Sequence, residues 1–175
     1  MLSEIKWFPM RVTYNRELKV KEYLDSIQIE NFLPFKPNHY EIDCQNKTNK
    51  KEVLIHNLIF IRSSQERITM LKNSSKSLEP LRYIIDRSSN QIMVVPDKQM
   101  NDFIRVSTSE EDTMLLDYKD FLDKVGKKVR ITQGYFSGVE GEIKRIKKNK
   151  YVVVKIDGLV AVALTCVPKS FLEII

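Results

Sequence analysis

Hydrophobic positions along the chain follow two different periods. Over the first hundred residues, short apolar runs that suit strands alternate with segments in which apolar residues recur every three or four positions, as in amphipathic helices. From Gly126 onward the period is two, and short β-type runs follow one another to the C-terminus. The pattern predicts an α+β domain, with helices covering an antiparallel sheet, followed by a small β-barrel.

The first part is predicted to alternate strands with three helices. Its expected strands cover residues 6–13, 53–61, 81–86 and 92–95, with an extended edge segment near Pro34 and Pro37. His56 and Asn57 interrupt the second of these strands, which is therefore either central in the sheet or bulged. The first helix is expected to begin at Asn15 as N-cap, because Val20, Leu24 and Ile27 then share one face. Further helices are expected over 65–73 and 96–104.

An acidic stretch separates the two parts. Residues 107–123 carry six acidic side chains and one basic side chain, which is typical of a linker. Six apolar residues within and just after it lie at helical spacing: Met114, Leu115, Tyr118, Phe121, Leu122 and Val125. We therefore expect a domain at 1–106, a partly helical linker at 107–123 and a β-barrel at 124–175. The apolar stripe either pads the barrel or covers a binding surface.

Charge is distributed unevenly along the chain. The net charge is +6, and residues 124–175 hold 11 basic and four acidic side chains. Such a basic region indicates a surface that faces nucleic acid or the ribosome, or only a solvated face. No stretch approaches the roughly 20 apolar residues that a membrane span needs, and no signal peptide is present, so we expect a cytoplasmic protein.

The residues that carry chemistry are few. Two cysteines, Cys44 and Cys166, and two histidines, His39 and His56, give no metal-ligand spacing, so we expect no metal and no cofactor. No nucleophile motif surrounds a serine or a cysteine, and an enzyme is not expected.

Glycines crowd into one segment, Val129–Ile143. Gly134, Gly138 and Gly141 are three of the chain's five glycines and fall between two predicted strands. No Gly-Lys-Ser/Thr follows them, so the segment is not a phosphate-binding loop. Glycine adopts positive φ without steric cost, which lets the chain turn and re-enter a sheet. Together with the aromatic pair that includes Phe136, the spacing closely resembles the KOW motif of NusG-like and some ribosomal proteins.

The first hundred residues resemble the N-terminal domain of NusG-type transcription factors. The segments "KWFPMRV", "ENFLPFKP", "IHNLIFI" and "IMVVPDKQM" stand in the places of that domain's motifs. The resemblance implies an N-terminal antiparallel sheet with flanking helices, followed by an SH3-like KOW barrel. The acidic linker and the divergent first domain look more like specialised paralogues of the RfaH and UpxY kind. Ile55 to Leu58 replace the family's Phe-Pro-Gly/Asn, which implies an aliphatic contact surface.

The resemblance also implies partners and site residues. The first domain would bind the clamp helices of RNA polymerase's largest subunit and suppress pausing and termination, at specific operons such as those for polysaccharide biosynthesis. The residues implied for polymerase binding are Phe8, Ile55, Leu58, Phe60, Val94 and Val95, and the alternative for each is core packing. Arg11, Arg16 and Lys19 would contact non-template DNA, or are only solvated charges.

The C-terminal domain is expected to recruit a second partner. In relatives this partner is termination factor Rho or a small-subunit ribosomal protein. Five cations near a predicted hairpin tip, Lys144, Arg145, Lys147, Lys148 and Lys150, can instead contact RNA or form a solvated turn. We expect a monomer. The rival interpretation is a ribosome- or RNA-associated KOW protein without effect on elongation.

Overall fold

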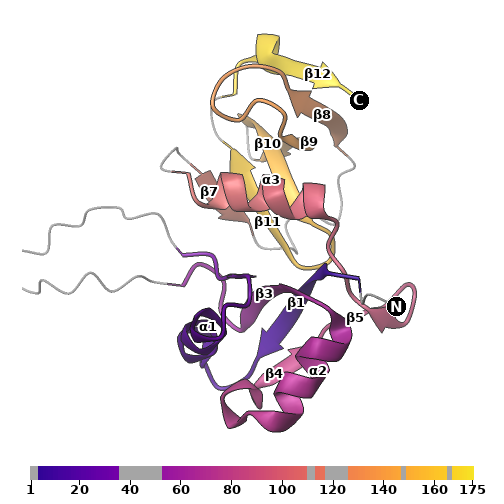
Figure 1. The fold of residues 1–175 in the computed structure, drawn as a ribbon. Helices are drawn as coiled ribbons and strands as arrows, with labels where there is room; N and C mark the ends of the chain where they lie inside the picture. Colours follow the sequence, from indigo (N-terminus) through magenta and orange to yellow (C-terminus); the bar gives the residue numbers. More distant parts are fainter. Residues whose placement is uncertain (1–3, 36–52, 110–112, 117–125, 147–148, 165–166) are drawn as a thin grey trace, which may run out of the picture. The chain divides into compact units, whose positions relative to one another are not determined.

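A computed structural model describes residues 4–35, 53–109, 113–116, 126–146, 149–164 and 167–175. They form two compact units (Figure 1). In the described parts of the chain, the first unit ends at Asp97 and the second begins at Lys98. The sequence placed the corresponding boundary at residue 106. The difference is helix α3 (Asp97–Ser107), whose side chains hydrogen-bond to the sheet of the second unit.

The first unit is built on a four-stranded antiparallel sheet in the order β2-β3-β1-β4. Its strands are β1 (Lys6–Val12), β2 (Asn31–Phe32), β3 (Leu58–Ser63) and β4 (Leu81–Tyr83). Its helices are α1 (Glu17–Ser26), α2 (Gln65–Ser74) and the 3-10 helix η1 (Lys76–Leu78). A short hairpin joins β5 (Ile85–Asp86) to β6 (Gln91–Ile92).

Strand alternation puts one face of this sheet into the core. Phe8 and Met10 of β1 and Ile59 and Ile61 of β3 lie in one buried cluster with residues from both α-helices and η1. Leu58 and Phe60 fall between them along β3 and are absent from that cluster, because successive side chains of a strand point to opposite faces. The expected α+β class, with helices covering an antiparallel sheet, is confirmed.

Several expected boundaries in the first unit were wrong. The strand expected over 81–86 is divided between β4 and β5, and the one expected over 92–95 is replaced by β6, which ends at Ile92. Arg16, not Asn15, is the N-cap of α1, because Asn15 has a left-handed backbone with φ 51°. The strand expected from Val53 begins only at Leu58. Asn57 has φ 61° and ends a turn, which directs the preceding residues out of the ladder. The interruption noted at His56 and Asn57 is therefore a turn and not a bulge.

The second unit contains a six-stranded sheet in the order β12-β8-β9-β10-β11-β7, and every pairing is antiparallel. Its strands are β7 (Thr113–Leu116), β8 (Lys127–Ile131), β9 (Glu140–Ile146), β10 (Asn149–Ile156), β11 (Val160–Leu164) and β12 (Leu172–Ile174). A 3-10 helix, η3 (Lys169–Phe171), precedes β12. Val152, Val154 and Val162 are buried on one face, and Val153, Ala161 and Ala163 are buried on the other.

The linker contributes a strand where a helix was expected. Thr113–Leu116 pair with Ala161–Leu164 of β11, and Leu116 packs against Val153 and Ala163. An edge strand presents unpaired backbone groups, and satisfying them overrides the helical spacing of Met114 and Leu115. The helix prediction is therefore wrong over 113–116, and its remaining part, 117–125, lies outside the described residues.

Candidate functional site

The six apolar residues expected to contact a partner do not share one face. Phe8 lies in the helix-covered core, where its ring meets that of Tyr83 edge-on with centroids 6.2 Å apart. Leu58 and Phe60 lie on the opposite side of the sheet, and the ring of Phe60 is 6.5 Å from that of Phe32. All three candidates are buried, with 3%, 6% and 0% of their surfaces exposed. Phe8 therefore packs in the core of the first unit, which was the alternative interpretation for it.

Ile55, Val94 and Val95 come from connections between elements. Ile55 is half-buried in the turn before β3. Val95 is buried and bridges to Trp7, whose carbonyl accepts its N–H at 2.9 Å. Val94 precedes it and is 40% exposed. Ile55 and Val94 are thus the two candidates that offer apolar surface to a partner without any rearrangement.

A cluster of positive charge lies where β1 ends and β4 begins; we call Arg11, Lys72 and Arg82 the cationic edge. Arg11 and Arg82 are directly opposite each other in the antiparallel register. A like-charge pair in this position is unfavourable. In the part of the chain that the structure describes, no carboxylate lies within ion-pair distance of these three residues. The cationic edge therefore has no direct ion-pair partner among the described residues.

Lys72 is affected both by burial and by the neighbouring charge of Arg82. Burial, and next the charge of Arg82, lower the pKa of the Lys72 ammonium. The ammonium lies 4.8 Å from the centroid of the Tyr83 ring, which provides a cation–π contact. Burial also raises the pKa of the Tyr83 phenol, and a hydrogen bond with Thr69 partly opposes this. Partial burial is the largest cause of both shifts, so Lys72 and Tyr83 are partly shielded from water.

The connection from β1 to α1 lies beside the cationic edge and presents an aromatic ring to solvent. Tyr14 is 83% exposed, and the guanidinium of Arg16 lies 5.8 Å from its ring centroid. Tyr14 and Asn15 both have left-handed backbones, with φ 65° and 51°. Thr13 fixes this loop to the start of β4, because its N–H and hydroxyl both donate to the Pro80 carbonyl, at 3.1 and 3.3 Å. Tyr14 was not among the site residues predicted from the sequence, although the sequence does place an aromatic residue between a strand and a cationic helix start.

The glycine loop, residues 132–139, connects β8 to β9. Gly134 and Gly138 have left-handed backbones, with φ 81° and 87°. Gly141 follows in β9, where a Cβ would lie 2.7 Å from the Val153 carbonyl oxygen, so this glycine is needed for close strand approach. Phe136 is buried between them. Left-handed turns thus account for Gly134 and Gly138, and the close approach of β10 accounts for Gly141.

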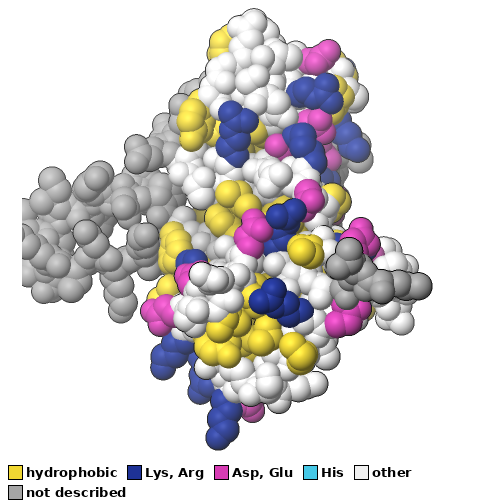
Figure 2. Space-filling model, viewed as in Figure 1, with side chains coloured by type: hydrophobic (Ala, Val, Ile, Leu, Met, Phe, Trp, Pro, Cys, Tyr) yellow, Lys and Arg dark blue, Asp and Glu magenta, His cyan; other side chains and the backbone are white. Residues whose placement is uncertain are grey.

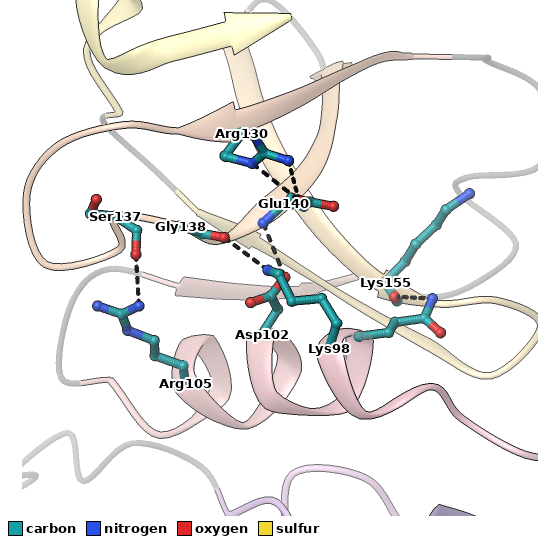
Figure 3. A network of polar contacts seen from close by, with 9 residues as sticks. Lys98, Asp102, Arg105, Arg130, Ser137, Gly138, Glu140 and Lys155 are labelled. Carbon is teal, nitrogen blue, oxygen red and sulfur yellow. Dashed lines mark hydrogen bonds and ion pairs between the residues drawn. The ribbon is translucent and has the colours of Figure 1, made fainter. Parts of the chain in front are cut away.

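Helix α3 binds the backbone of this glycine loop (Figure 3). Arg105 donates to the carbonyls of Ser137, at 2.8 Å, and Tyr135. Lys98 donates to the carbonyl of Gly138 at 2.8 Å and to the carboxylate of Asp102. Apart from the Lys98–Asp102 pair within α3, these contacts join residues 30 or more positions apart, which is why helical periodicity did not predict them.

Two further contacts extend this network to the strands. The nearly buried carboxylate of Asp102 accepts the backbone N–H of Glu140 at 3.1 Å, and the Glu140 carboxylate in turn accepts from Arg130 (Figure 3). Gln99 donates to the carbonyl of Lys155 at 3.0 Å. Polar side chains of α3 therefore form hydrogen bonds with β9, β10 and the glycine loop.

The basic residues near the β9–β10 turn fall into two kinds. Lys144 lies within β9, its side chain is 9% exposed, and it pairs with Glu142 at 3.6 Å. Its placement at an open hairpin tip does not agree with the structure. Arg145 and Lys150 are exposed and opposite each other in the register. Lys147 and Lys148 lie outside the described residues.

Lys155 also belongs to an ion-pair network. Burial opposes its charge, but its ion pairs with Glu142 and Asp157, at 2.7 and 2.9 Å, raise the pKa of the Lys155 ammonium. Across the described residues, no three His, Cys, Asp or Glu side chains are grouped to hold a metal ion. None of the helices in the described part is long and apolar enough to span a membrane.

Fold and surfaces together define a two-unit α+β protein with exposed cationic and apolar groups on its first unit. The chain belongs to the NusG family of transcription factors: the family model described as "Transcription termination factor nusG" matches residues 5–104. Proteins of this family are non-enzymatic, act in transcript elongation and antitermination, and typically bind RNA polymerase.

Comparisons with curated proteins and with solved structures add the following. No curated protein matches the sequence. Among solved structures, the chain is similar to that described as "Domain interaction in Thermotoga maritima NusG", with 19% identity, a TM-score of 0.45 and coverage of 98% of each chain.

Proposed function

We propose that this protein is an elongation and antitermination factor that binds the clamp helices of the largest RNA polymerase subunit. The observation that carries the proposal is the family match over residues 5–104, which spans the sheet, α1 and α2. Ile55 and Val94 offer accessible apolar side chains near opposite ends of β1, and Leu58 and Phe60 lie on the sheet face away from the helical core. The acidic linker and the aliphatic Ile55–Leu58 segment favour a specialised role of the RfaH or UpxY kind, at operons such as those for polysaccharide biosynthesis.

The mechanism requires no bond chemistry. A pause requires the polymerase clamp to open, so a factor with higher affinity for the closed clamp shifts the population toward the elongating state. The size of the shift equals the difference between its affinities for the two states. A factor that bound both states equally would not change pausing at all.

Arg11, Arg16 and Lys19 are proposed to contact the non-template DNA strand. All three side chains are exposed, and none has an ion-pair partner in the described part of the chain. Lys19 follows Arg16 by three residues, which places both on one side of α1. Contacts of this kind with phosphates position a protein on a strand.

The second unit is proposed to be a KOW module with an SH3-like barrel that recruits Rho, a small-subunit ribosomal protein or RNA. The left-handed Gly134 and Gly138 support the KOW assignment. Exposed Arg145 and Lys150 support an RNA contact, and they are also the observation that favours the rival function, a ribosome- or RNA-associated protein without effect on elongation.

Transcription in vitro with the native polymerase, on a template carrying the leader of this gene's own operon, tests the proposal. Wild-type protein is expected to shorten pauses and increase read-through. Ile55→Asp with Val94→Asp is expected to lower polymerase affinity at least about tenfold, because a buried unpaired charge is costly. Met70→Asp, on the exposed outer side of α2, is the matched control and is expected to bind normally. Unchanged co-purification of the double variant would exclude Ile55 and Val94 as polymerase contacts.

A further inference from the structure

The β1–α1 connection combines backbone strain with an exposed aromatic ring. A left-handed backbone is uncommon for any residue other than glycine, and here Tyr14 and Asn15 adopt it in succession. The outcome is a ring that is 83% exposed and contributes nothing to the apolar core. Strain of this kind concentrates at binding sites, where the surrounding structure maintains it. The two bonds from Thr13 to the Pro80 carbonyl provide that support.

One cation lies beside this ring, and two more lie on the strands that the loop adjoins, at one corner of the first unit. Arg16 lies over Tyr14, and Arg11 and Arg82 lie opposite each other on the adjoining strands. In Figure 2, dark blue side chains collect at the lower left of the first unit, below α1. The carboxylate nearest in sequence, Glu17, is buried and accepts the backbone N–H of Asn57, while Arg82 binds Glu79 through its carbonyl and not its carboxylate. The corner therefore attracts anions.

The chemistry that fits this corner is a single nucleic-acid strand. Aromatic side chains that carry stacked bases, beside cations that follow the phosphates, are the two components of such sites. A duplex keeps its bases paired and stacked inside, so it offers no free base face to an exposed ring. The like-charge pair of Arg11 and Arg82 is relieved when a phosphate lies between them, whereas it is only a cost in the unbound protein.

We propose that Tyr14 is a base-stacking platform for single-stranded nucleic acid and that Arg11, Arg16 and Arg82 hold the flanking phosphates. This proposal rests on the DNA contact proposed above and extends it to a base contact, but it requires neither the polymerase nor the apolar surface at Ile55 and Val94. A base stacked on Tyr14 allows the protein to discriminate between nucleotide sequences, which phosphate contacts alone do not allow.

Binding of the full-length chain to labelled oligonucleotides at low salt tests the proposal. Three ligands of one sequence are compared: single-stranded DNA, single-stranded RNA and the DNA duplex, each single strand carrying one 2-aminopurine to report stacking. Tyr14→Asn removes the ring and keeps a residue that tolerates the left-handed backbone. It is expected to weaken single-strand binding about 5- to 150-fold and to abolish the 2-aminopurine change. Tyr14→Phe is expected to retain both.

Tyr135 offers a matched control on the second unit. It is 62% exposed, and the guanidinium of Arg105 lies 5.7 Å from its ring centroid, but both Nη1 and Nη2 of that guanidinium already donate to carbonyls. Arg82, in contrast, binds two carbonyls through Nη1 alone. Tyr135→Asn is expected to bind as the wild type does. Arg82→Gln is expected to reduce the slope of log affinity against log salt by about 0.7 for a single strand.

Several results would overturn the proposal: no binding of either single strand, equal binding of the duplex, or equal losses for Tyr14→Asn and Tyr135→Asn. A preference for DNA or for RNA identifies which strand the platform serves. Tyr14→Asn is expected to bind polymerase that carries no nucleic acid as the wild type does. Failure of the stacking proposal therefore leaves the polymerase assay intact, and failure of the polymerase proposal leaves the oligonucleotide assay intact.

Discussion

At the scale of single residues, the glycines of the second unit have separable roles. Gly138 has a left-handed φ of 87°, and a Cβ there would meet no atom within 4 Å. Gly141 has the reverse requirement, since its Cβ would lie 2.7 Å from the Val153 carbonyl oxygen and 3.0 Å from a Val152 methyl carbon. One position therefore needs a particular backbone conformation, and the other needs the absence of a side chain.

Asparagine substitutions distinguish these two roles. Gly138→Asn is expected to change the free energy of unfolding little, because asparagine tolerates the left-handed region. Gly141→Asn is expected to lower it by about 1–3 kcal/mol, because β9 and β10 must separate to admit the side chain. Urea unfolding followed by circular dichroism measures both variants. Equal losses would show that the close approach of Gly141 to Val153 does not limit stability.

The sequence could predict that these glycines shape turns, because their spacing between strand-like runs is a local feature. It could not predict which glycine is sterically confined. The atom that confines Gly141 belongs to Val153 on the next strand, and strand register is a property of the folded sheet. The same limit applies to Tyr14, since exposure depends on what packs around a ring.

At the scale of elements, α3 shows how the polar side chains of a helix attach it to a sheet. Asp102 is the buried centre of its polar contacts, accepting from Glu140 on β9 and from Lys98 one turn earlier on α3. Lys98, in contrast, keeps a largely exposed side chain. The two partners of one ion pair should therefore contribute very differently to stability.

Asp102→Ala is expected to release α3 from the second unit. It leaves the Glu140 N–H without its acceptor and should cost about 1–3 kcal/mol, whereas Lys98→Ala should cost at most about 1 kcal/mol because exposed ion pairs contribute little. Amide hydrogen exchange measures this directly. Protection of α3 and the glycine loop should fall in Asp102→Ala, with protection of β1 and β3 unchanged. Equal exchange in both variants would mean that Asp102 contributes no more than Lys98 to holding α3 in place.

Helices and strands were predicted well where the pattern of their own residues determines them. The amphipathic pattern identified α1, α2 and α3, and the period of two identified β8 to β11. The errors lie where another element decides the outcome. Thr113–Leu116 form a strand because β11 offers a free edge, and β12 was missed because its three residues are ordered by pairing with β8. Propensity and periodicity do not contain that information.

At the scale of the whole molecule, the family match and the grouping by contacts assign α3 to different parts of the chain. The family match runs through it to residue 104, yet contacts group the chain from Lys98 onward with the second unit. The sequence placed α3 in the first domain because it follows the closing "IMVVP" segment along the chain. The order of segments can be read from the sequence, whereas the hydrogen bonds from α3 to the glycine loop cannot.

Charge reversal on the second unit separates the proposed function from its rival. Arg145→Glu with Lys150→Glu is expected to leave polymerase binding and pause suppression unchanged, because the polymerase contact is assigned to the first unit. Affinity for RNA, and its salt dependence, should fall in this variant, since fewer counterions are released when fewer cations meet phosphates. Lys127→Glu with Lys169→Glu changes the net charge equally on exposed positions and serves as control. If the wild type binds RNA through Arg145 and Lys150 but never alters elongation, the ribosome- or RNA-associated function replaces the one proposed here.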